Sequence, residues 1–76
     1  MLVFERPGCR HCARGRKCLR KNKIPFTSVK CKDTEELKTK LKEHKLRIPK
    51  VLTFPRVYDG KKLLGGADDI EKRYSA

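Results

Sequence analysis

The sequence is poor in the features that mark several common classes of protein. It contains no tryptophan and one methionine, and only nine acidic residues stand against 21 lysines and arginines. It has no apolar run long enough to cross a bilayer, so we do not expect a membrane protein. The first five residues meet the acidic Glu5 before any basic residue, which is not the pattern of a secretory signal. We therefore expect a cytoplasmic location.

Length and charge limit the fold and its partners. A chain of 76 residues can form one domain but not two, so we predict a single domain over residues 1–76 that acts as a monomer. The formal net charge is +12, which favours acidic proteins, anionic small molecules or nucleic acid as partners. The charge is uneven, because ten basic residues and no acidic one lie from Arg6 to Lys32. The positive charge is therefore concentrated in the first part of the chain.

Hydrophobic periodicity and turn residues predict an α/β fold. Strands are expected at residues 2–4 and 26–29, and a hairpin with strands at 56–58 and 61–64 is expected to turn at Asp59-Gly60. Helices are expected at residues 10–21, from a cap at Asp33 to residue 44 or 45, and at 67–74. The helix residues expected to face the core are Cys12, Ala13, Gly15, Arg16, Leu19, Leu37, Leu41, Ala67, Ile70 and Tyr74. The order β-α-β-α-β-β-α predicts a mixed four-stranded sheet flanked by helices, with a parallel first pair of strands.

Cys9 and Cys12 carry the strongest chemical signal among the residues. Cys9 is expected to precede the first helix and Cys12 to lie in its first turn, close enough for a disulfide. The positive end of the helix favours a thiolate at Cys9, which makes Cys9 the predicted nucleophile and Cys12 the predicted resolving thiol. Arg10 and His11 add positive charge beside the thiolate and are expected to tune its acidity, which indicates a comparatively oxidising couple.

A Cys-x-x-Cys pair is also half of a zinc site, and this alternative stays open. In the cytoplasm, four cysteines favour redox or metal chemistry over a permanent disulfide framework. Cys18 and Cys31 could complete four zinc ligands, but their spacing matches no common zinc-finger pattern. We therefore predict no metal site and interpret Cys18 and Cys31 as half-buried thiols without an assigned role. His44 is interpreted as a surface or boundary residue.

Three short motifs follow one another in the order of the predicted elements. They are Pro7-Gly8-Cys9-Arg10-His11-Cys12 after the first strand, Thr53-Phe54-Pro55 before the third, and Gly65-Gly66-Ala67-Asp68-Asp69 before the last helix. With these motifs, nearly the whole chain resembles the glutaredoxins, which are dithiol oxidoreductases with a thioredoxin-like fold. The resemblance implies that Pro55 is cis and lies opposite the two cysteines. It also implies glutathione as co-substrate, with no tightly bound cofactor.

The same resemblance implies a glutathione site. Its expected residues are Arg6, His11, Thr53, Phe54, Pro55, Gly66, Asp68 and Asp69. Arg6 stands where the family usually has a lysine near the thiolate, so it joins Arg10 and His11 as a group that tunes the acidity of Cys9. Asp68 and Asp69 are expected at a helix start, where backbone amides bind the γ-glutamyl carboxylate and an acid meets the ammonium group. Gly65-Gly66 is interpreted as permitting close approach of the backbone to this ligand.

Two positions depart from the family pattern. Family members commonly carry Pro-Tyr between the cysteines, where this chain has Arg10-His11. Phe54 stands in place of a common valine and is expected to narrow the groove. These departures bear on how glutathione is held.

Three functional hypotheses follow. The leading one is a glutathione-linked oxidoreductase that reduces protein disulfides or glutathione mixed disulfides. The second keeps the dithiol but draws electrons from a flavoprotein thioredoxin reductase, because the departures weaken the glutathione site. The third is a zinc-binding module whose basic face binds nucleic acid. We favour it least, because the aromatics Phe4, Phe26, Phe54, Tyr58 and Tyr74 resemble strand and core residues.

A run of basic residues on the first helix also allows two interpretations. It comprises Arg14, Arg16, Lys17, Arg20, Lys21 and Lys23. The simpler interpretation is a solvated helix face. The functional one is a docking surface for an acidic protein substrate or a phosphate-bearing partner.

Overall fold

A computed structural model describes residues 1–74 as a four-stranded mixed sheet with three helices. The last two residues of the predicted domain, 75 and 76, lie outside the described residues. The elements in chain order are β1 (Leu2–Glu5), α1 (Arg10–Lys21), β2 (Thr27–Lys30), α2 (Thr34–Glu43), β3 (Arg56–Asp59), β4 (Lys62–Gly65) and α3 (Ala67–Tyr74). The predicted fold class is confirmed. No helix within residues 1–74 is long and apolar enough to span a membrane.

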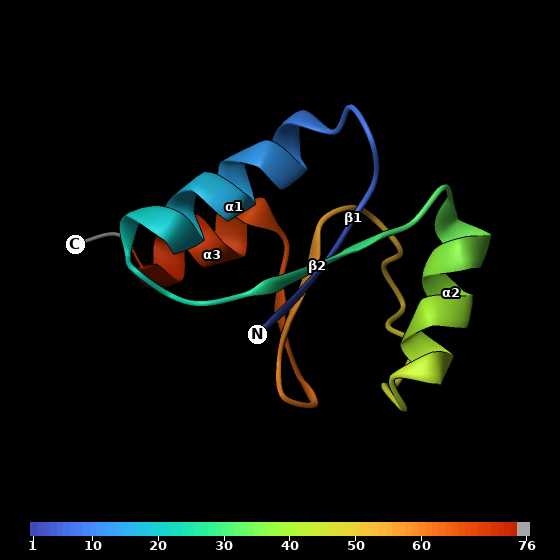
Figure 1. Cartoon of the computed structure of the whole chain (residues 1–76). Helices are drawn as coiled ribbons and strands as arrows, with labels where there is room; N and C mark the ends of the chain where they lie inside the picture. The colour runs from blue at the N-terminus through green and yellow to red at the C-terminus, as the bar shows by residue number, and fades with distance from the viewer. Residues whose placement is uncertain (75–76) are drawn as a thin grey trace.

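The strand order is β2-β1-β3-β4, with β1 parallel to β2 and antiparallel to β3. Side chains of β1 and β3 alternate between the two faces of the sheet. Val3 and Val57 pack on the face covered by α1 and α3, whereas Phe4 and Tyr58 pack on the face covered by α2 (Figure 1). Buried helix and loop residues complete these clusters, namely Leu19 and Ile70 on the first face and Cys31, Leu37, Leu41 and Leu46 on the second. The central strands are thus buried on both faces.

Local sequence explains where the helices begin. The side chain of Asp33 accepts a hydrogen bond from the Glu36 amide at 2.9 Å, and the Glu36 carboxylate accepts one from the Lys32 amide at 3.1 Å. These two bonds satisfy backbone donors that the first turn of α2 leaves unpaired. The predicted cap at Asp33 is confirmed, and α2 ends at Glu43 with His44 as its C-terminal cap. His44 is exposed and its ring meets Phe4 edge-on at 5.6 Å.

Several local predictions are wrong. The turn and one strand are displaced by one residue, and Ala13 lies on a different face of its helix from the one expected. The hairpin turns at Gly60 and Lys61 rather than at Asp59-Gly60, because Asp59 still pairs with Lys62 and Gly60 takes the positive φ of 62°. Strand β2 begins one residue after Phe26 and extends to Lys30. Ala13 is exposed, since the buried face of α1 follows Cys12, Gly15 and Leu19 at helical spacing.

Candidate active site

Cys9 forms the N-terminal cap of α1. Its Sγ accepts a hydrogen bond from the backbone N–H of Cys12 at 3.2 Å, and its thiol donates to the carbonyl of Phe54 at 3.9 Å. An amide donor and the positive end of a helix both stabilise negative charge on this sulfur. Cys9 is half-buried, so its sulfur is open to a substrate from one side. The geometry suits a nucleophile.

Cys12 lies one turn inside the helix and is 1% exposed. Burial, helped by a hydrogen bond to the side chain of Cys9, raises the pKa of the Cys12 thiol to about 12. At neutral pH Cys12 is therefore a thiol, and a thiol is a far weaker nucleophile than a thiolate. The two cysteines differ in exposure as the helix position predicts, and this difference orders their reactivity.

The three groups expected to tune Cys9 are placed differently from one another. The Arg6 guanidinium lies over the Phe54 ring, 5.9 Å from its centroid, and Arg10 is exposed. His11 Nδ1 lies 3.0 Å from an Arg14 nitrogen. The His11 ring is therefore within hydrogen-bond distance of Arg14, one turn further along α1.

Two adjoining cavities beside Cys9, of about 300 and 450 Å³, form what we call the groove. Both are lined by His11, Thr53 and Phe54. The smaller cavity adds Arg56, Gly66, Ala67, Asp68 and Asp69, and the larger adds Arg6, Cys9, Asp33, Thr34 and Leu52. The groove thus brings together seven of the eight residues expected to bind glutathione, although they come from distant parts of the chain.

The eighth residue, Pro55, lies buried behind the groove. The Phe54-Pro55 peptide bond is cis, as the resemblance implies. Pro55 is fully buried, and its Cγ would lie 3.6 Å from a β-carbon at Gly15, one turn after Cys12. The proline therefore packs against the helix that carries both cysteines.

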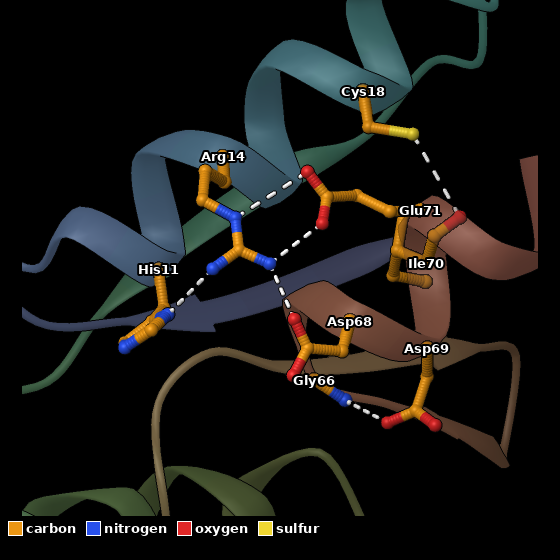
Figure 2. Close-up of polar contacts among 8 residues, drawn as sticks. All are labelled: His11, Arg14, Cys18, Gly66, Asp68, Asp69, Ile70 and Glu71. Atoms are coloured by element: carbon orange, nitrogen blue, oxygen red, sulfur yellow. Dashed lines mark hydrogen bonds and ion pairs between the residues drawn. The ribbon is translucent and has the colours of Figure 1, made fainter. Parts of the chain in front are cut away.

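The start of α3 is held by its own side chains and by α1 (Figure 2). Asp69 accepts a hydrogen bond from the Gly66 amide at 2.9 Å. Arg14 of α1 reaches across to α3, where it forms ion pairs with Asp68 and with Glu71, the latter at 2.6 Å. The Glu71 and Asp68 carboxylates raise the pKa of Arg14, and Arg14 in turn lowers the pKa of Glu71. Asp68, the expected partner of a ligand ammonium, is therefore paired with Arg14 here.

The two glycines before α3 differ in what a side chain would meet. Gly65 has a φ of 122°, and a β-carbon there would lie 2.3 Å from an Asp69 oxygen. At Gly66 a β-carbon would lie 2.9 Å from the end of the flexible Arg56 side chain, which can move aside. Contacts within the protein therefore explain Gly65, whereas close approach of a ligand stays the prediction for Gly66.

Sequence reasoning missed several residues of the site. Arg56 was interpreted only as part of a strand, yet it lies in the groove beside Gly66 and donates to the Pro55 carbonyl at 3.1 Å. Arg14 was placed on a basic helix face, yet it joins α1 to α3. The position of Arg56 next to Thr53-Phe54-Pro55 is a signal that could have found it. Arg14 had no such signal, because its partners lie 54 and 57 residues away.

The other two cysteines lie apart from the site and from each other. Cys18 donates toward the Ile70 carbonyl at 3.7 Å and borders a cavity of about 510 Å³ between α1 and α3. Cys31 is 1% exposed in the cluster under α2, so the expectation of a half-buried thiol is wrong for this residue. The two thiols thus occupy opposite faces of the sheet and cannot share one metal ion with Cys9 and Cys12. Among residues 1–74, no group of three or more His, Cys, Asp or Glu side chains is placed to hold a metal.

A further cavity is also lined by Cys9. It has a volume of about 520 Å³ and we call it the basic cavity. Its lining comprises Glu5, Arg6, Pro7, Gly8, Cys9, Arg10, Ala13, Arg16 and Lys30. Within it Arg16 forms an ion pair with Glu5 at 2.5 Å, so this part of the basic helix face is not simply solvated.

Comparison with known proteins agrees with the fold. The family model described as Glutaredoxin matches residues 1–63. A curated relative, "Glutaredoxin 1" of Rickettsia bellii (strain RML369-C), is 23% identical over 70 residues, which cover 92% of this chain and 71% of the relative. The matched region contains Cys9, Cys12 and the cis-proline segment. The chain therefore belongs to the glutaredoxin family, whose chemistry is thiol–disulfide oxidoreduction.

Proposed function

We propose that this chain is a glutathione-linked oxidoreductase that reduces protein disulfides and glutathione mixed disulfides through the dithiol of Cys9 and Cys12. The observation that carries the proposal is the contrast between the two sulfurs. Cys9 is half-buried and accepts a helix amide, whereas Cys12 is 1% exposed and protonated at neutral pH. Such a pair supplies one sulfur that attacks the substrate disulfide and a second that later attacks the mixed disulfide.

The reaction begins at Cys9. Its thiolate attacks one sulfur of the substrate disulfide, forms a mixed disulfide with that sulfur and expels the other as a thiolate. Cys12 then attacks the Cys9 sulfur, closes the Cys9–Cys12 disulfide and releases the substrate thiol. Two glutathione molecules reduce this disulfide in successive exchanges and leave as oxidised glutathione.

We propose that glutathione binds in the groove beside Cys9. Its cysteine would lie along Thr53 and Phe54, and its γ-glutamyl end would reach the start of α3. There the carboxylate faces backbone amides of a helix N-terminus, and Asp68 and Asp69 can meet the ammonium group. Arg6 and Arg56 line the groove and offer positive charge to the carboxylates of the ligand.

The test separates the roles of the two cysteines. Cys12→Ser should keep turnover of a glutathionylated peptide with glutathione and glutathione reductase, because that route needs only Cys9. The same variant should lose reduction of a protein disulfide, which needs the second thiol. Cys9→Ser should lose both activities.

A matched control removes a thiol elsewhere. Cys18→Ser deletes a half-buried cysteine on the same helix, away from the groove, and should behave as the unmodified chain. Full protein-disulfide reduction by Cys12→Ser would contradict the assigned roles. Absence of glutathione-dependent turnover in the unmodified chain would contradict the link to glutathione.

The ion pair between Arg14 and Asp68 supports an electron donor other than glutathione. Because Arg14 already pairs with Asp68, a ligand ammonium must compete for that carboxylate. This competition favours the alternative in which a flavoprotein thioredoxin reductase reduces the Cys9–Cys12 disulfide. Turnover measured with glutathione plus glutathione reductase, against turnover with thioredoxin reductase, distinguishes the two donors.

The charge of the chain favours acidic protein substrates. Lys17, Arg20, Lys21 and Lys23 stay on the exposed or partly exposed side of α1 and its end, beyond the paired Arg14 and Arg16. Such a surface speeds encounter with an acidic partner and loses that advantage as salt rises. We place the reaction in the cytoplasm, where the glutathione pool can supply electrons.

A further inference from the structure

We propose that the basic cavity binds an acidic segment of the protein substrate, with Arg10 and Lys30 contacting Asp or Glu side chains next to the substrate cysteine. The inference rests on the dithiol function proposed above and deepens it by assigning a substrate class to one surface. Glutathione is proposed to occupy the groove, so the basic cavity has no ligand yet. In the sequence-based predictions Lys30 has no role, and Arg10 is expected only to tune Cys9.

The basic cavity and the groove meet at Cys9. Both are lined by Cys9 and Arg6, and the rest of their linings differs. A disulfide carries one chain on each of its two sulfurs, and only one of these chains can occupy the groove. The other chain must lie on a different surface beside Cys9, and the basic cavity is a hollow at that place.

The volume of the basic cavity suits a short peptide segment. It measures about 520 Å³, within the range of about 300–1,000 Å³ that is typical of sites for drug-sized ligands. Because Cys9 is the proposed nucleophile, a chain that enters this cavity during the reaction is attached to the reacting disulfide. The occupant is therefore the polypeptide on either side of the substrate cysteine.

The charge of the cavity selects an anionic segment. Its one acid, Glu5, is 3% exposed and already pairs with Arg16 at 2.5 Å. The other three charged residues of the lining are exposed cations, namely Arg6, Arg10 and Lys30. Within residues 1–74 none of these three forms an ion pair. The cavity thus presents three positive charges that no carboxylate of the described chain neutralises.

Different elements hold these cations at the cavity. Lys30 ends β2 and is aligned with Glu5 in the parallel ladder, so its side chain takes the face of the sheet that α1 covers. Because β2 is an edge strand, Lys30 stays exposed there. Arg10 is the first residue of α1 and directly follows Cys9. The end of a strand and the start of a helix therefore border one hollow with positive charge.

The three charges exceed what the sulfur requires. The Cys9 sulfur already accepts the Cys12 amide and lies at the positive end of α1, and both stabilise a thiolate. Like charges gathered in one place repel each other and lower the stability of the folded chain. A substrate carboxylate relieves this repulsion when it docks, and exposed cations also speed the encounter with an acidic partner. The arrangement therefore favours substrates with acids near the reacting disulfide.

The alternative in which the cations only support the Cys9 thiolate makes a different prediction. In that case the loss of Arg10 or Lys30 slows attack on acidic and neutral substrates by the same factor. If the cations bind substrate carboxylates, their loss slows attack on the acidic substrate more. The ratio of the two rates decides, because both substrates meet the same sulfur.

The experiment uses two glutathionylated peptides of one sequence, with Glu on both sides of the cysteine in one and Gln in the other. Reduced protein is mixed with each peptide and quenched with acid, and mass spectrometry measures the released peptide thiol over time. We expect the unmodified chain to react about tenfold faster with the Glu peptide at low salt. Arg10→Gln and Lys30→Gln should each reduce this ratio about two- to fivefold, the range of one exposed ion pair. The double variant should bring it close to one.

The controls separate a local site from a general effect of charge. Lys42→Gln removes one positive charge from the exposed side of α2, on the other face of the sheet, and should leave the ratio unchanged. Arg6 is kept in every variant because it also lines the groove. In a second peptide pair the Glu or Gln residues stand six positions from the cysteine, about 20 Å away in an extended chain, and the ratio should be near one.

Salt dependence tests the unmodified chain directly and needs no variant to fold. Exposed charges are screened by salt, so the ratio should fall toward one as sodium chloride rises from about 0.05 to 0.5 M. A ratio that stays constant over this range would mean that the cations do not contact the substrate acids.

The outcomes separate this inference from the proposed function. A ratio near one in the unmodified chain, or a ratio that Arg10→Gln and Lys30→Gln leave unchanged, overturns the docking site and leaves the dithiol function standing. A ratio near one, with a single-stranded oligonucleotide that protects Cys9 from alkylation, assigns the cavity to nucleic acid instead. A chain that releases neither peptide overturns the proposed function and this inference with it. A ratio that both variants reduce and Lys42→Gln does not supports both.

Discussion

The buried Cys12 thiol should make the stability of the reduced protein fall at alkaline pH. Its pKa is raised in the folded state, to about 12, from the value of 9.0 expected of an unfolded chain. A group with a raised folded pKa contributes its full stability below the unfolded pKa and loses it as pH rises through the folded pKa. Each pH unit in that window removes about 1.4 kcal/mol from the free energy of unfolding. Between about pH 8 and pH 10.5 the loss from Cys12 amounts to about 2 kcal/mol.

The assay compares variants so that other titrating groups cancel. Urea unfolding of the unmodified chain and of Cys12→Ser, both reduced and kept free of oxygen, gives the stability gap between them at each pH. Burial also raises the pKa of Cys31 and of Tyr58, but both residues are present in both proteins. The gap should shrink with rising pH by the stated amount. Cys9→Ser should keep most of the alkaline loss, because burial is the largest cause of the shift.

A constant gap would refute this reasoning. If it changed by less than about 0.5 kcal/mol over the same interval, Cys12 would titrate alike in the folded and unfolded chains. A raised pKa of Cys12 could then not explain why Cys9 attacks first.

Three further changes test the packing around the site. Leu19→Ala should lower the free energy of unfolding by about 2–5 kcal/mol in urea melts, because Leu19 is fully buried under α1. Glu71→Gln should weaken the acid dependence of stability below pH 4.5, since Arg14 lowers the Glu71 pKa and the carboxylate's contribution is lost as pH falls through that lowered value. Gly65→Ala should cost about 1–3 kcal/mol by thermal or urea unfolding, because it strains a positive φ and displaces Asp69 from its cap.

For each of these three predictions, one outcome would contradict the expected result. A loss below about 1 kcal/mol in Leu19→Ala would mean that the cluster around Val3 is loosely packed. An unchanged acid profile in Glu71→Gln would mean that the ion pair with Arg14 does not persist in solution. An unchanged melting temperature in Gly65→Ala would mean that the backbone at this position relaxes at no cost.

Much of the fold could be predicted because the signals are local. The Asp33 cap, the apolar residues of β1 and the acids that begin α3 each act within a few residues of the structure they specify. The hairpin shows the limit of such signals. Asp59-Gly60 marks a turn correctly, but the pairing of Asp59 with Lys62 depends on the ladder between β3 and β4 and shifts the turn by one residue. The ends of a strand are set by its pairing with a neighbouring strand, and this pairing joins residues that local sequence signals do not relate.

The sequence by itself determined how Cys9 and Cys12 sit on the first helix, because their spacing of three residues at a helix start makes one sulfur the half-buried cap and places the other in the buried first turn. Only the tertiary structure decided how the surrounding charges are used. Arg14 and Arg16 lie in one basic run, yet Arg14 joins α1 to α3 and Arg16 holds the buried Glu5. Each arginine pairs with whichever carboxylate the folded chain brings within a few ångströms of it. The burial of the pair then determines how strongly the two charges interact. Neither the partner nor the burial can be inferred from neighbouring residues in the sequence.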